Sequence, residues 1–375
     1  MTTKKIAVLH DAFLYRGGGE RLVTLMAKAL DADLISGFFS EWSFVPEELG
    51  FFGQKIALGK PVFKKWIRHL ILKNRFHKAT KLLKNYEMII LSGNCLDVLR
   101  NFSKKPNQKI FYYCHTPPRY LFDFREMYLQ KFPKIFRPMI SYFFDKQAKK
   151  YIEFLDKIDQ IFTNSQNTHD RLLYFCGKNS EILYPPTDTT RFSPADAKNP
   201  LPNLPENYYL SFSRLSPPKR VGLVVDAFLQ MPDKNLVFTY GKNDPLKEEI
   251  LEKCQHAKSI FPIPAPNDDD FIRLVQNAIA NIYIPIDEDF GMSPVESMAC
   301  GIPVIGVNEW GLKETVINGK TGVLLPAKIQ VSDIIAGVQK IDEKTALALR
   351  ENCVQRAETF SLENFIANLK KFLEK

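Results

Sequence analysis

The sequence lacks the features that mark membrane-spanning, disulfide-stabilised and structural-zinc proteins. No segment approaches the roughly 18 to 20 uninterrupted apolar residues that a membrane span needs. The six cysteines are scattered singly, without a Cys-x-x-Cys pair or a histidine at zinc-ligand spacing. We therefore expect reduced, mostly buried thiols. The first ten residues enter a strand-like run without a signal-peptide pattern, so we expect a cytoplasmic location, possibly peripheral on the inner face of a membrane.

Acidic residues are missing from one long segment, residues 60–84, which holds nine Lys or Arg. The net charge of the whole chain is +9, so the remainder is formally neutral. Apolar residues recur between these cations at helical spacing, which indicates a cationic helix with one apolar stripe. Such a helix can lie on an anionic membrane surface, or it can pack its stripe on the core while lysines reach solvent. Nucleic acid is the least favoured partner, because no nucleic-acid-binding motif accompanies the segment. The stripe comprises Phe63, Trp66, Ile67, Leu70, Ile71 and Phe76.

The chain is too long for a single hydrophobic core, and its composition of 45% hydrophobic and 25% charged residues is that of a globular protein. Short apolar runs alternate with helical patterns, which predicts doubly wound parallel sheets. The expected strands are 6–9, 33–38, 88–91, 110–114, 160–163 and 181–184 in the first half, and 208–212, 236–240, 259–262, 280–284, 304–307 and 322–325 in the second.

A proline-rich stretch, 184–205, predicts an interdomain linker. We therefore expect an N-terminal domain over residues 1–186 and a C-terminal domain over residues 187–360. A final helix over 361–375 is expected to pack back onto the first domain. In open α/β sheets, ligands bind outside the carboxyl ends of the strands, so loops at these ends are the first place to look for a site.

The loop before the expected helix at residue 294 combines carboxylates, glycine and a helix start. Ser293 is expected to be the N-cap and Pro294 the first helical residue, which would leave the amides of Gly291, Met292 and Ser293 free to bind an anion such as a diphosphate. Glu288 precedes this loop and Glu296 follows it, where carboxylates could accept hydrogen bonds from sugar hydroxyls. Ser293 and Glu296 equally fit a capping box, with no role beyond the helix start.

Two cations follow the first expected strand of the second half. Arg214 and Lys219 are spaced so that both could reach one diphosphate, although surface cations without a ligand are an equally ordinary reading. In the first half, Gly17, Gly18 and Gly19 lie between strand and helix, where backbone amides can approach a ligand. The Gly-x-Gly-x-x-Gly spacing of a nicotinamide-binding domain is absent.

His115 ends another strand and is followed by two prolines, which hold it at the strand terminus. A structural role is the ordinary expectation for a lone histidine. His10 and Asp11, at the end of the first strand, are weaker candidates for contact with a substrate. Asp268, Asp269 and Asp270 precede a helical run, and helix capping explains them better than a metal site does. Glu314 follows a glycine-containing loop whose turn and helix start are sufficient explanations.

Taken as whole strings, these motifs resemble those of the family 4 retaining glycosyltransferases. The resemblance covers two glutamates eight positions apart, with Asp289 replacing the usual first glycine, and an Arg followed five residues later by Lys. It also covers the Gly-Gly-x-Glu loop ending at Glu20. The string His115-Thr-Pro-Pro-Arg-Tyr resembles a motif of a mannosyltransferase-like subgroup.

The resemblance implies a GT-B architecture, with two Rossmann-like domains facing each other across a cleft. It implies a retaining, metal-independent hexosyltransferase without a cofactor, using a nucleotide sugar, with GDP-mannose favoured and UDP-sugars open. The acceptor would be a glycan or a lipid-linked glycan in cell-surface polysaccharide synthesis. A glycan phosphorylase and a non-catalytic membrane-associated protein of the same fold are the alternatives from other classes.

The resemblance also assigns roles to residues. Catalysis falls to Glu288, His115, Arg214 and Lys219. Donor binding adds Phe290, Gly291, Met292, Ser293 and Glu296, whereas the acceptor and phosphate loop comprises Gly17, Gly18, Gly19 and Asp11.

Overall fold

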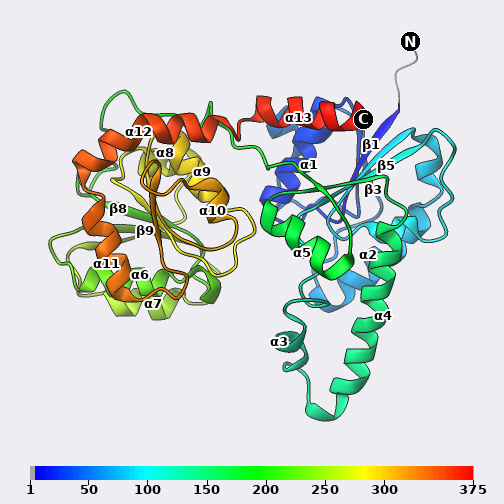
Figure 1. The fold of residues 1–375 in the computed structure, drawn as a ribbon, viewed down its shortest axis with the longest axis horizontal. Helices are drawn as coiled ribbons and strands as arrows, with labels where there is room; N and C mark the ends of the chain where they lie inside the picture. Colours follow the sequence, from blue (N-terminus) through cyan, green and yellow to red (C-terminus); the bar gives the residue numbers. More distant parts are fainter. Residues whose placement is uncertain (1–4, 375) are drawn as a thin grey trace. The chain divides into compact units, whose positions relative to one another are not determined.

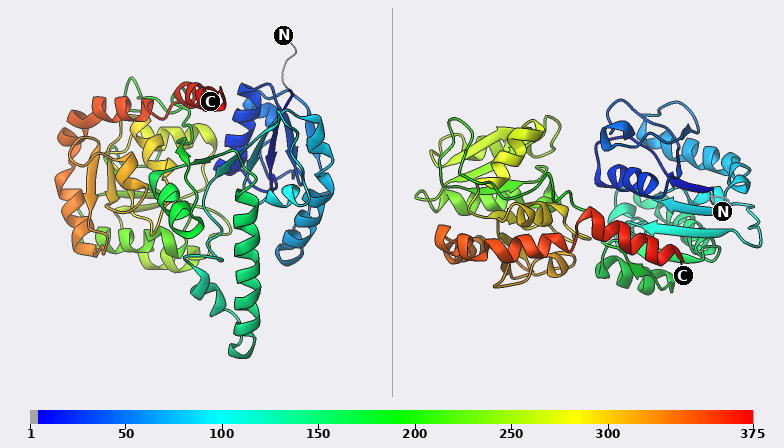
Figure 2. Two further views of the ribbon diagram at one scale, coloured as in Figure 1. Left: turned by 45° about the vertical axis from the view of Figure 1, so that its right-hand side comes forward. Right: turned by 90° about the horizontal axis from the view of Figure 1, so that it is seen from above.

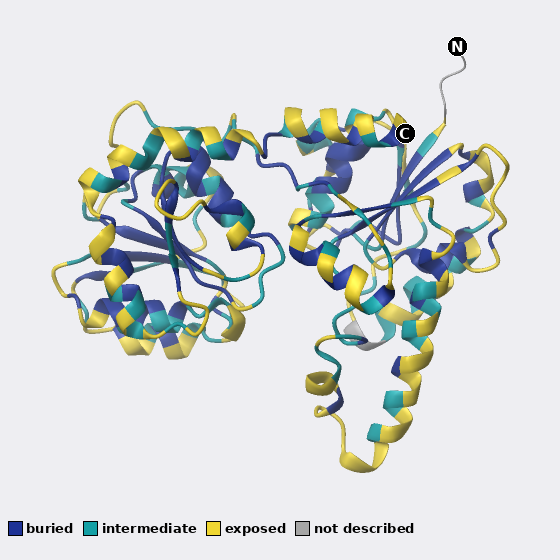
Figure 3. Cartoon of the chain, in the orientation of Figure 1, coloured by how far each residue is buried: buried dark blue, intermediate teal, exposed yellow. Residues whose placement is uncertain are grey.

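The computed structural model describes residues 5–374, except the side chains of Lys65 and Trp66. The chain divides into two compact units, Met1–Leu183 and Tyr184–Lys375. Each unit is built around its own parallel sheet with helices packed on the sheet's faces (Figures 1 and 2). In both sheets the central strands are buried and the outer helix faces are exposed (Figure 3).

The first unit contains a seven-stranded sheet of order β3-β2-β1-β4-β5-β6-β7, in which all pairs are parallel. Its strands are β1 Ile6–His10, β2 Asp33–Ser36, β3 Lys55–Ala57, β4 Met88–Ser92, β5 Lys109–Cys114, β6 Gln160–Thr163 and β7 Glu181–Ile182. Its α-helices are α1 Gly18–Ala29, α2 Lys65–Ala79, α3 Arg125–Leu129, α4 Arg137–Leu155 and α5 Gln166–Cys176. Short 3-10 helices are η1 Pro46–Leu49, η2 Leu82–Asn85, η3 Leu96–Leu99 and η4 Lys134–Phe136.

The second unit contains a six-stranded parallel sheet of order β10-β9-β8-β11-β12-β13. Its strands are β8 Tyr209–Phe212, β9 Leu236–Tyr240, β10 Ile260–Pro264, β11 Asn281–Tyr283, β12 Val304–Val307 and β13 Gly322–Leu325. Its helices are η5 Pro217–Lys219, α6 Val221–Leu229, α7 Lys247–Cys254, α8 Asp268–Gln276, α9 Met292–Ala299, α10 Leu312–Thr315, α11 Val331–Lys340, α12 Glu343–Glu358 and α13 Leu362–Glu374.

The prediction of doubly wound parallel α/β sheets is confirmed, and each sheet has one topological switch point. The strand order reverses between β1 and β4 in the first unit and between β8 and β11 in the second. At such a point the crossover helices leave to opposite faces, which opens a crevice outside the carboxyl ends of the two strands. The two switch points are therefore where a ligand site is expected in each unit.

The proline-rich stretch 184–205 lies between β7 and β8 as irregular chain of the second unit. It is anchored there, because Phe192 is buried in the second unit's core and Leu201 and Leu204 pack against the same cluster. A backbone bridge also joins Thr187 to Ser361. The packing of residues 361–375 onto the first unit stays a prediction.

The cationic segment 60–84 forms α2 followed by η2, a shorter helix than its charge pattern predicts. Part of its apolar stripe packs inward, since Phe76 is fully buried in the first unit's core. Leu70 and Phe63 are exposed. Trp66 of the predicted stripe lies outside the described side chains. All six cysteines are free and buried, as predicted.

Candidate active site

The loops at the second unit's switch point are joined by an ion pair. Lys219 ends the short helix η5 after β8, and its Nζ donates to Glu288 Oε2 at 2.6 Å and to the Tyr283 hydroxyl at 2.8 Å. Tyr283 is the last residue of β11, and Glu288 lies in the loop that follows. The sequence placed Lys219 and Glu288 in one site, and the structure brings them into contact. Tyr283 is the partner that sequence reasoning missed.

Arg220 fixes the loop that carries Glu288. Its guanidinium donates from Nε to the carbonyl oxygen of Ile284 at 2.6 Å and from Nη2 to that of Pro285 at 2.8 Å. The backbone amide of Ile286 donates to Pro218 O at 2.7 Å, which adds a third tie between the two loops. Arg220 adopts a left-handed backbone conformation with φ of 53°. That conformation turns its side chain back across the strand ends, and no sequence signal reports it.

Gly311 holds the far side of the same loop. Its amide donates to Glu288 O at 3.1 Å. A Cβ atom at this position would lie 2.3 Å from the carbonyl oxygen of Asp289, so only glycine allows the two backbones to approach. The glycine-containing loop that the sequence singled out therefore acts on the position of Glu288 through backbone contact.

Helix α9 begins two residues earlier than the sequence predicts. Gly291 is the N-cap, with φ of 86°, and no side chain caps the helix. The prediction that Ser293 is the N-cap, with Pro294 as the first helical residue, is wrong. Glycine at 291 reaches the left-handed conformation at little cost, and the helix can therefore start at Met292. The amides of Met292 and Ser293 still belong to the first turn, where intrahelical acceptors are absent.

Glu296 falls after the first turn of α9, as its fifth residue, and the predicted capping box does not form. Its carboxylate lies near the Tyr283 phenol. Burial, together with the nearby Glu288 and Glu296 carboxylates, raises the pKa of Tyr283 well above its ordinary value. Tyr283 is therefore a neutral hydrogen-bonding group throughout the physiological range. Both predicted glutamates thus border this tyrosine.

Two other predicted donor residues differ in how they are presented. Arg214 is exposed in the loop after β8, and no hydrogen bond or ion pair of its side chain is found among residues 5–374. Phe290 is buried, with its ring 5.5 Å from that of Tyr184 and 5.4 Å from that of Phe360. Only the backbone of Phe290 can therefore meet a ligand, whereas the Arg214 guanidinium is available to one.

The first unit's switch point carries a hydrogen-bonded chain of polar side chains. Ser92, the last residue of β4, is fully buried between two histidines. Its Oγ lies 3.1 Å from His10 Nδ1 and 2.9 Å from His115 Nε2. The other ring nitrogen of His10 lies 3.1 Å from Asp11 Oδ1. The predicted residues Asp11 and His115 are thus joined through His10 and Ser92, and sequence reasoning missed Ser92.

The imidazole of His115 is neutral at physiological pH. Its desolvation, with a smaller effect of neighbouring His10, lowers the pKa of His115 to about 4. It can therefore exchange hydrogen bonds with a hydroxyl without carrying charge.

The predicted glycine loop lies directly against this chain. Gly17 is the N-cap of α1 and Gly18 its first residue. A Cβ atom at Gly19 would lie 3.5 Å from His10 Cε1 and 3.7 Å from His115 Cε1. The start of helix α1 therefore lies next to the two histidines, and a role of this loop in ligand binding stays a prediction.

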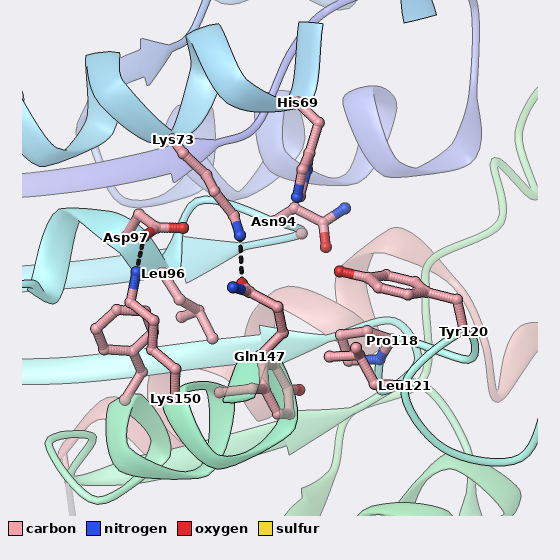
Figure 4. A pocket seen from close by; sticks show the side chains of 13 residues that line it. His69, Lys73, Asn94, Leu96, Asp97, Pro118, Tyr120, Leu121, Gln147 and Lys150 are labelled. Carbon is pink, nitrogen blue, oxygen red and sulfur yellow. Dashed lines mark hydrogen bonds and ion pairs between the residues drawn. The ribbon is translucent and has the colours of Figure 1, made fainter. Parts of the chain in front are cut away.

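A small pocket of about 50 Å³ opens beside the first unit's switch point. His69, Asn94 and Tyr120 are directed into it, and Lys73 donates to Gln147 at its wall (Figure 4). Asn94 also donates to Asp11, so the pocket adjoins the polar chain. Desolvation lowers the pKa of Lys73 below its ordinary value. Cationic and apolar side chains line the pocket together with Asp97, which pairs with Lys150 at 2.5 Å.

The two acidic motifs that the sequence explained by helix starts behave as expected. Asp268, Asp269 and Asp270 form the first turn of α8, where Asn267 is the cap and accepts from the Asp270 amide. Glu314 lies in α10, where it accepts a hydrogen bond from the Tyr184 hydroxyl at 3.1 Å. Arg356 donates to its carbonyl oxygen. No cluster of three metal-ligating side chains is found among the described residues.

Two solved structures share this architecture over nearly their full length. Anabaena Alr3699/HepE, solved in complex with UDP and glucose, has a TM-score of 0.74 at 15% identity and covers 99% of this chain and 100% of its own. Sucrose-phosphate synthase from Thermosynechococcus elongatus has a TM-score of 0.76 at 17% identity and covers 99% and 98%. The fold is therefore the GT-B fold, which is used by glycosyltransferases.

The family assignment follows from the second unit. The family model of "Glycosyl transferases group 1" matches residues 193–360, the segment that contains Lys219, Glu288 and α9. The alpha-1,3/1,6-mannosyltransferase ALG2 of Dictyostelium discoideum is 28% identical over 364 residues, which span 82% of this chain and 83% of that relative. Residues 193–360 therefore belong to the glycosyl transferases group 1 family, and the chain is a glycosyltransferase. Over the described residues, no helix is long and apolar enough to cross a bilayer.

Proposed function

We propose that this glycosyltransferase transfers a hexose, with retention of anomeric configuration, from a nucleotide sugar to a glycan or lipid-linked glycan acceptor in cell-surface polysaccharide synthesis. Mannose from GDP-mannose is the favoured donor. Two observations support it: the His115-Thr-Pro-Pro-Arg-Tyr string, and the similarity to a protein named as a mannosyltransferase.

The observation that carries the proposal is the contact between Lys219 and Glu288 beside the uncapped start of α9. A diphosphate at this position would meet Lys219 and the amides of Met292 and Ser293, and Arg214 is free to add a bidentate contact. Glu288 would then accept hydrogen bonds from the hydroxyls of the sugar, while Glu296 binds the ribose. In the free protein Lys219 and Glu288 satisfy each other.

In the proposed transfer, the main task of the protein is to stabilise the departing nucleotide. A protein side chain acting as a general base toward the acceptor is less important. Fixed cations and amides around the diphosphate stabilise the charge that develops on the leaving oxygen, a task for which this proposal invokes no metal ion. Retention would follow from departure and attack on the same face of the sugar. The leaving phosphate would then take the acceptor proton.

The acceptor is assigned to the first unit. Neutral His115, positioned by Ser92, would contact the transferred sugar near its hydroxymethyl group, and Asp11 with the glycine loop would contact the acceptor. The pocket lined by His69 and Lys73 would hold a phosphate of a lipid-linked acceptor. The cationic segment 60–84 would lie near an anionic membrane surface.

A thermal-shift panel with GDP, UDP, ADP and their sugars tests the donor assignment. A ligand at about 100 times its Kd stabilises the folded state by roughly 2.7 kcal/mol. We expect this for GDP and GDP-mannose in the wild type, and a much smaller shift in Arg214→Ala. The matched control is Lys258→Ala. Lys258 is an exposed cation before the amino end of β10, whereas Arg214 follows the carboxyl end of β8. Equal shifts in both variants would remove Arg214 from the site.

A UDP-sugar donor is the second candidate, favoured by the fold similarity to a protein solved with UDP and glucose. The same panel separates the two, because only one nucleotide base should give the large shift. Release of that nucleotide from the matching sugar donor, followed in the presence of a lipid-linked acceptor, then identifies the reaction. A chain that no nucleotide stabilises would contradict both candidates.

A further inference from the structure

The first unit carries a helical projection whose end is unusually apolar. Helix α3, η4 and the first half of α4 extend away from the unit's sheet in two views (Figures 1 and 2). We call residues 121–148 the arm and residues 127–143 its tip. Of the 21 exposed large hydrophobic side chains among the described residues, 8 lie in the tip. They are Met127, Tyr128, Phe132, Ile135, Phe136, Met139, Tyr142 and Phe143.

The arm is an ordered element with its own small core. Leu121, Leu129 and Phe144 are buried together and hold α3 against α4. Arg125 reinforces this packing by donating to Asp145 and to the Ser141 hydroxyl, at 2.6 and 2.7 Å. The exposed apolar side chains are therefore not needed for the arm's own packing, which the buried cluster already provides.

The loop at the end of the arm has a defined shape as well. Arg137 donates to the carbonyl oxygens of Phe132 and Gln130, which closes the turn before α4. Ile135 is 82% exposed at its outermost part, and Met139 is 65% exposed on the first turn of α4. Figure 3 shows that most of the tip is exposed, with Leu129 buried and Arg137, Ile140 and Ser141 intermediate. A concentration of exposed apolar side chains on one projection indicates an interaction surface.

The charges of the tip select the partner. Lys131, Lys134 and Arg137 lie among the apolar residues, and no Asp or Glu occurs from 127 to 144. Long cationic side chains interleaved with aromatic and aliphatic ones are the composition of segments that lie in a membrane interface. Anionic headgroups attract the cations while the apolar side chains enter the acyl boundary.

We propose that the tip of the arm docks this enzyme on a lipid bilayer with anionic headgroups. This surface is distinct from α2, whose Phe76 packs into the core and among whose described side chains Leu70 is the exposed large hydrophobic one. The inference deepens the proposed lipid-linked acceptor by naming the element that brings the enzyme to it. It does not depend on which sugar donor is used.

The test is co-sedimentation of the full chain with phosphatidylglycerol-containing vesicles and with neutral phosphatidylcholine vesicles, without any sugar donor. We expect preferential binding to the anionic vesicles. The combined variant Ile135→Ser, Phe136→Ser and Met139→Ser should lower the partition coefficient by about tenfold or more. Lys131→Gln with Lys134→Gln should lower binding to anionic vesicles by about tenfold and leave binding to neutral ones unchanged.

Two matched variants control for general loss of apolar surface. Leu229→Ser, Ile317→Ser and Leu347→Ser remove three exposed apolar residues of the second unit, and Leu70→Ser removes one from α2. Both should bind vesicles as the wild type does. Thermal unfolding of the tip variant should match that of the wild type, because its three positions lie outside the arm's core. Donor hydrolysis without vesicles should also be unchanged, so failure of docking is distinguishable from failure of the proposed activity.

Insertion is measured with Ile135→Trp, in which brominated lipid should quench more tryptophan fluorescence than in the wild type with its three native tryptophans, whereas Leu347→Trp should show no such gain. Wild-type binding by the tip triple variant would overturn the proposal, as would equal binding of the wild type to neutral and anionic vesicles. A chain that ignores vesicles but forms a dimer dissociated by the triple variant would also overturn it, and would identify a second copy as the occupant.

Discussion

The two switch points lie at the same place in similar parallel sheets, but they differ in charge. An ion pair lies at the second unit's switch point, and hydrogen-bonded uncharged groups lie at the first unit's. In the second unit, a cation and a carboxylate meet directly, as Lys219 with Glu288. In the first unit, a buried hydroxyl joins two histidines, and His115 is neutral. Charged groups suit a ligand that brings its own charge, whereas neutral groups suit hydroxyls. The contrast therefore supports placing the charged diphosphate on the second unit, and the acceptor with the hydroxymethyl group of the transferred sugar on the first.

The largest effect is expected from removing the ion pair between Lys219 and Glu288 in the second unit. Glu288→Gln keeps the shape of the side chain but removes the charge that Lys219 meets, and we expect kcat to fall by about 10² to 10³. Adding Lys219→Met should cost less than the two single changes predict, because the groups interact directly. The measurement is nucleotide release with the true donor.

The control pair for that experiment is Lys253 with Asp226, an exposed ion pair of 2.9 Å in the same unit. Neutralising an exposed pair typically changes stability by under about 1 kcal/mol. We expect full activity after Asp226→Asn. Activity of Glu288→Gln within about threefold of the wild type would exclude the carboxylate charge from transition-state stabilisation.

Substitution of His115 in the first unit should lower activity less than substitution of Glu288 does, and it should not alter nucleotide binding. His115→Ala removes a group that is proposed to contact the transferred sugar near its hydroxymethyl group, and we expect kcat to fall by about 10². The thermal shift given by the donor nucleotide should stay as in the wild type. His169→Ala, which removes a histidine bonded to Ser180 in the same unit, is the control. Loss of nucleotide binding in His115→Ala would break the proposed division of labour.

The neutrality of His115 can be tested through stability. Its pKa is about 4 in the folded protein and near 6.5 when unfolded, so the unfolded state binds more protons between these values. The contribution of neutral His115 to the free energy of unfolding should therefore be fully present above pH 6.5. It should be lost as the pH falls toward 4, by up to roughly 3 kcal/mol. Urea unfolding of the wild type and His115→Asn across this range measures the difference. Identical slopes for the two proteins would mean that His115 is not held neutral.

A smaller effect is expected from the residue that fixes the Glu288 loop. Arg220→Lys keeps the charge but loses the fork that bonds two carbonyl oxygens, and we expect about a tenfold loss of kcat/KM. Arg273→Lys is the matched control. Arg273 lies in α8 and also donates to backbone oxygens, those of Asn199 and Pro200. Equal loss of activity in both variants would show a general effect of destabilisation.

Much of the fold was predictable because buried parallel strands are short apolar runs bounded by turn residues. Twelve of the 13 strands fall where the sequence predicts them, with small differences at their ends. The missing one, β3 Lys55–Ala57, is a three-residue edge strand with little apolar character to reveal it. The tip of the arm was also missed, because its apolar residues look like a helix face that the core would cover.

Site residues could be proposed from the sequence where charged side chains, histidine or glycine occur in a distinctive pattern. Lys219, Glu288, His115, Asp11 and the three glycines were singled out from the sequence, and the first four lie at the switch point of their unit. Ser92, Tyr283 and Arg220 were missed, because a buried serine, a strand-end tyrosine and a loop arginine carry no distinctive pattern. Their roles depend on strand order and on a left-handed backbone, which only the tertiary structure determines.

The smallest expected effect concerns the start of α9, where sequence and structure disagree. If Ser293 capped the helix, Ser293→Ala would cost about 1 kcal/mol. In the structure Gly291 is the cap, and the Ser293 side chain makes no capping bond. We therefore expect Ser293→Ala to change the free energy of unfolding by less than about 0.5 kcal/mol. Gly291→Ala should destabilise more, since a φ of 86° disfavours any residue with a Cβ. The reverse order in urea unfolding would restore Ser293 as the cap. It would also move the first free amides of α9 away from the residues that are proposed to bind the diphosphate.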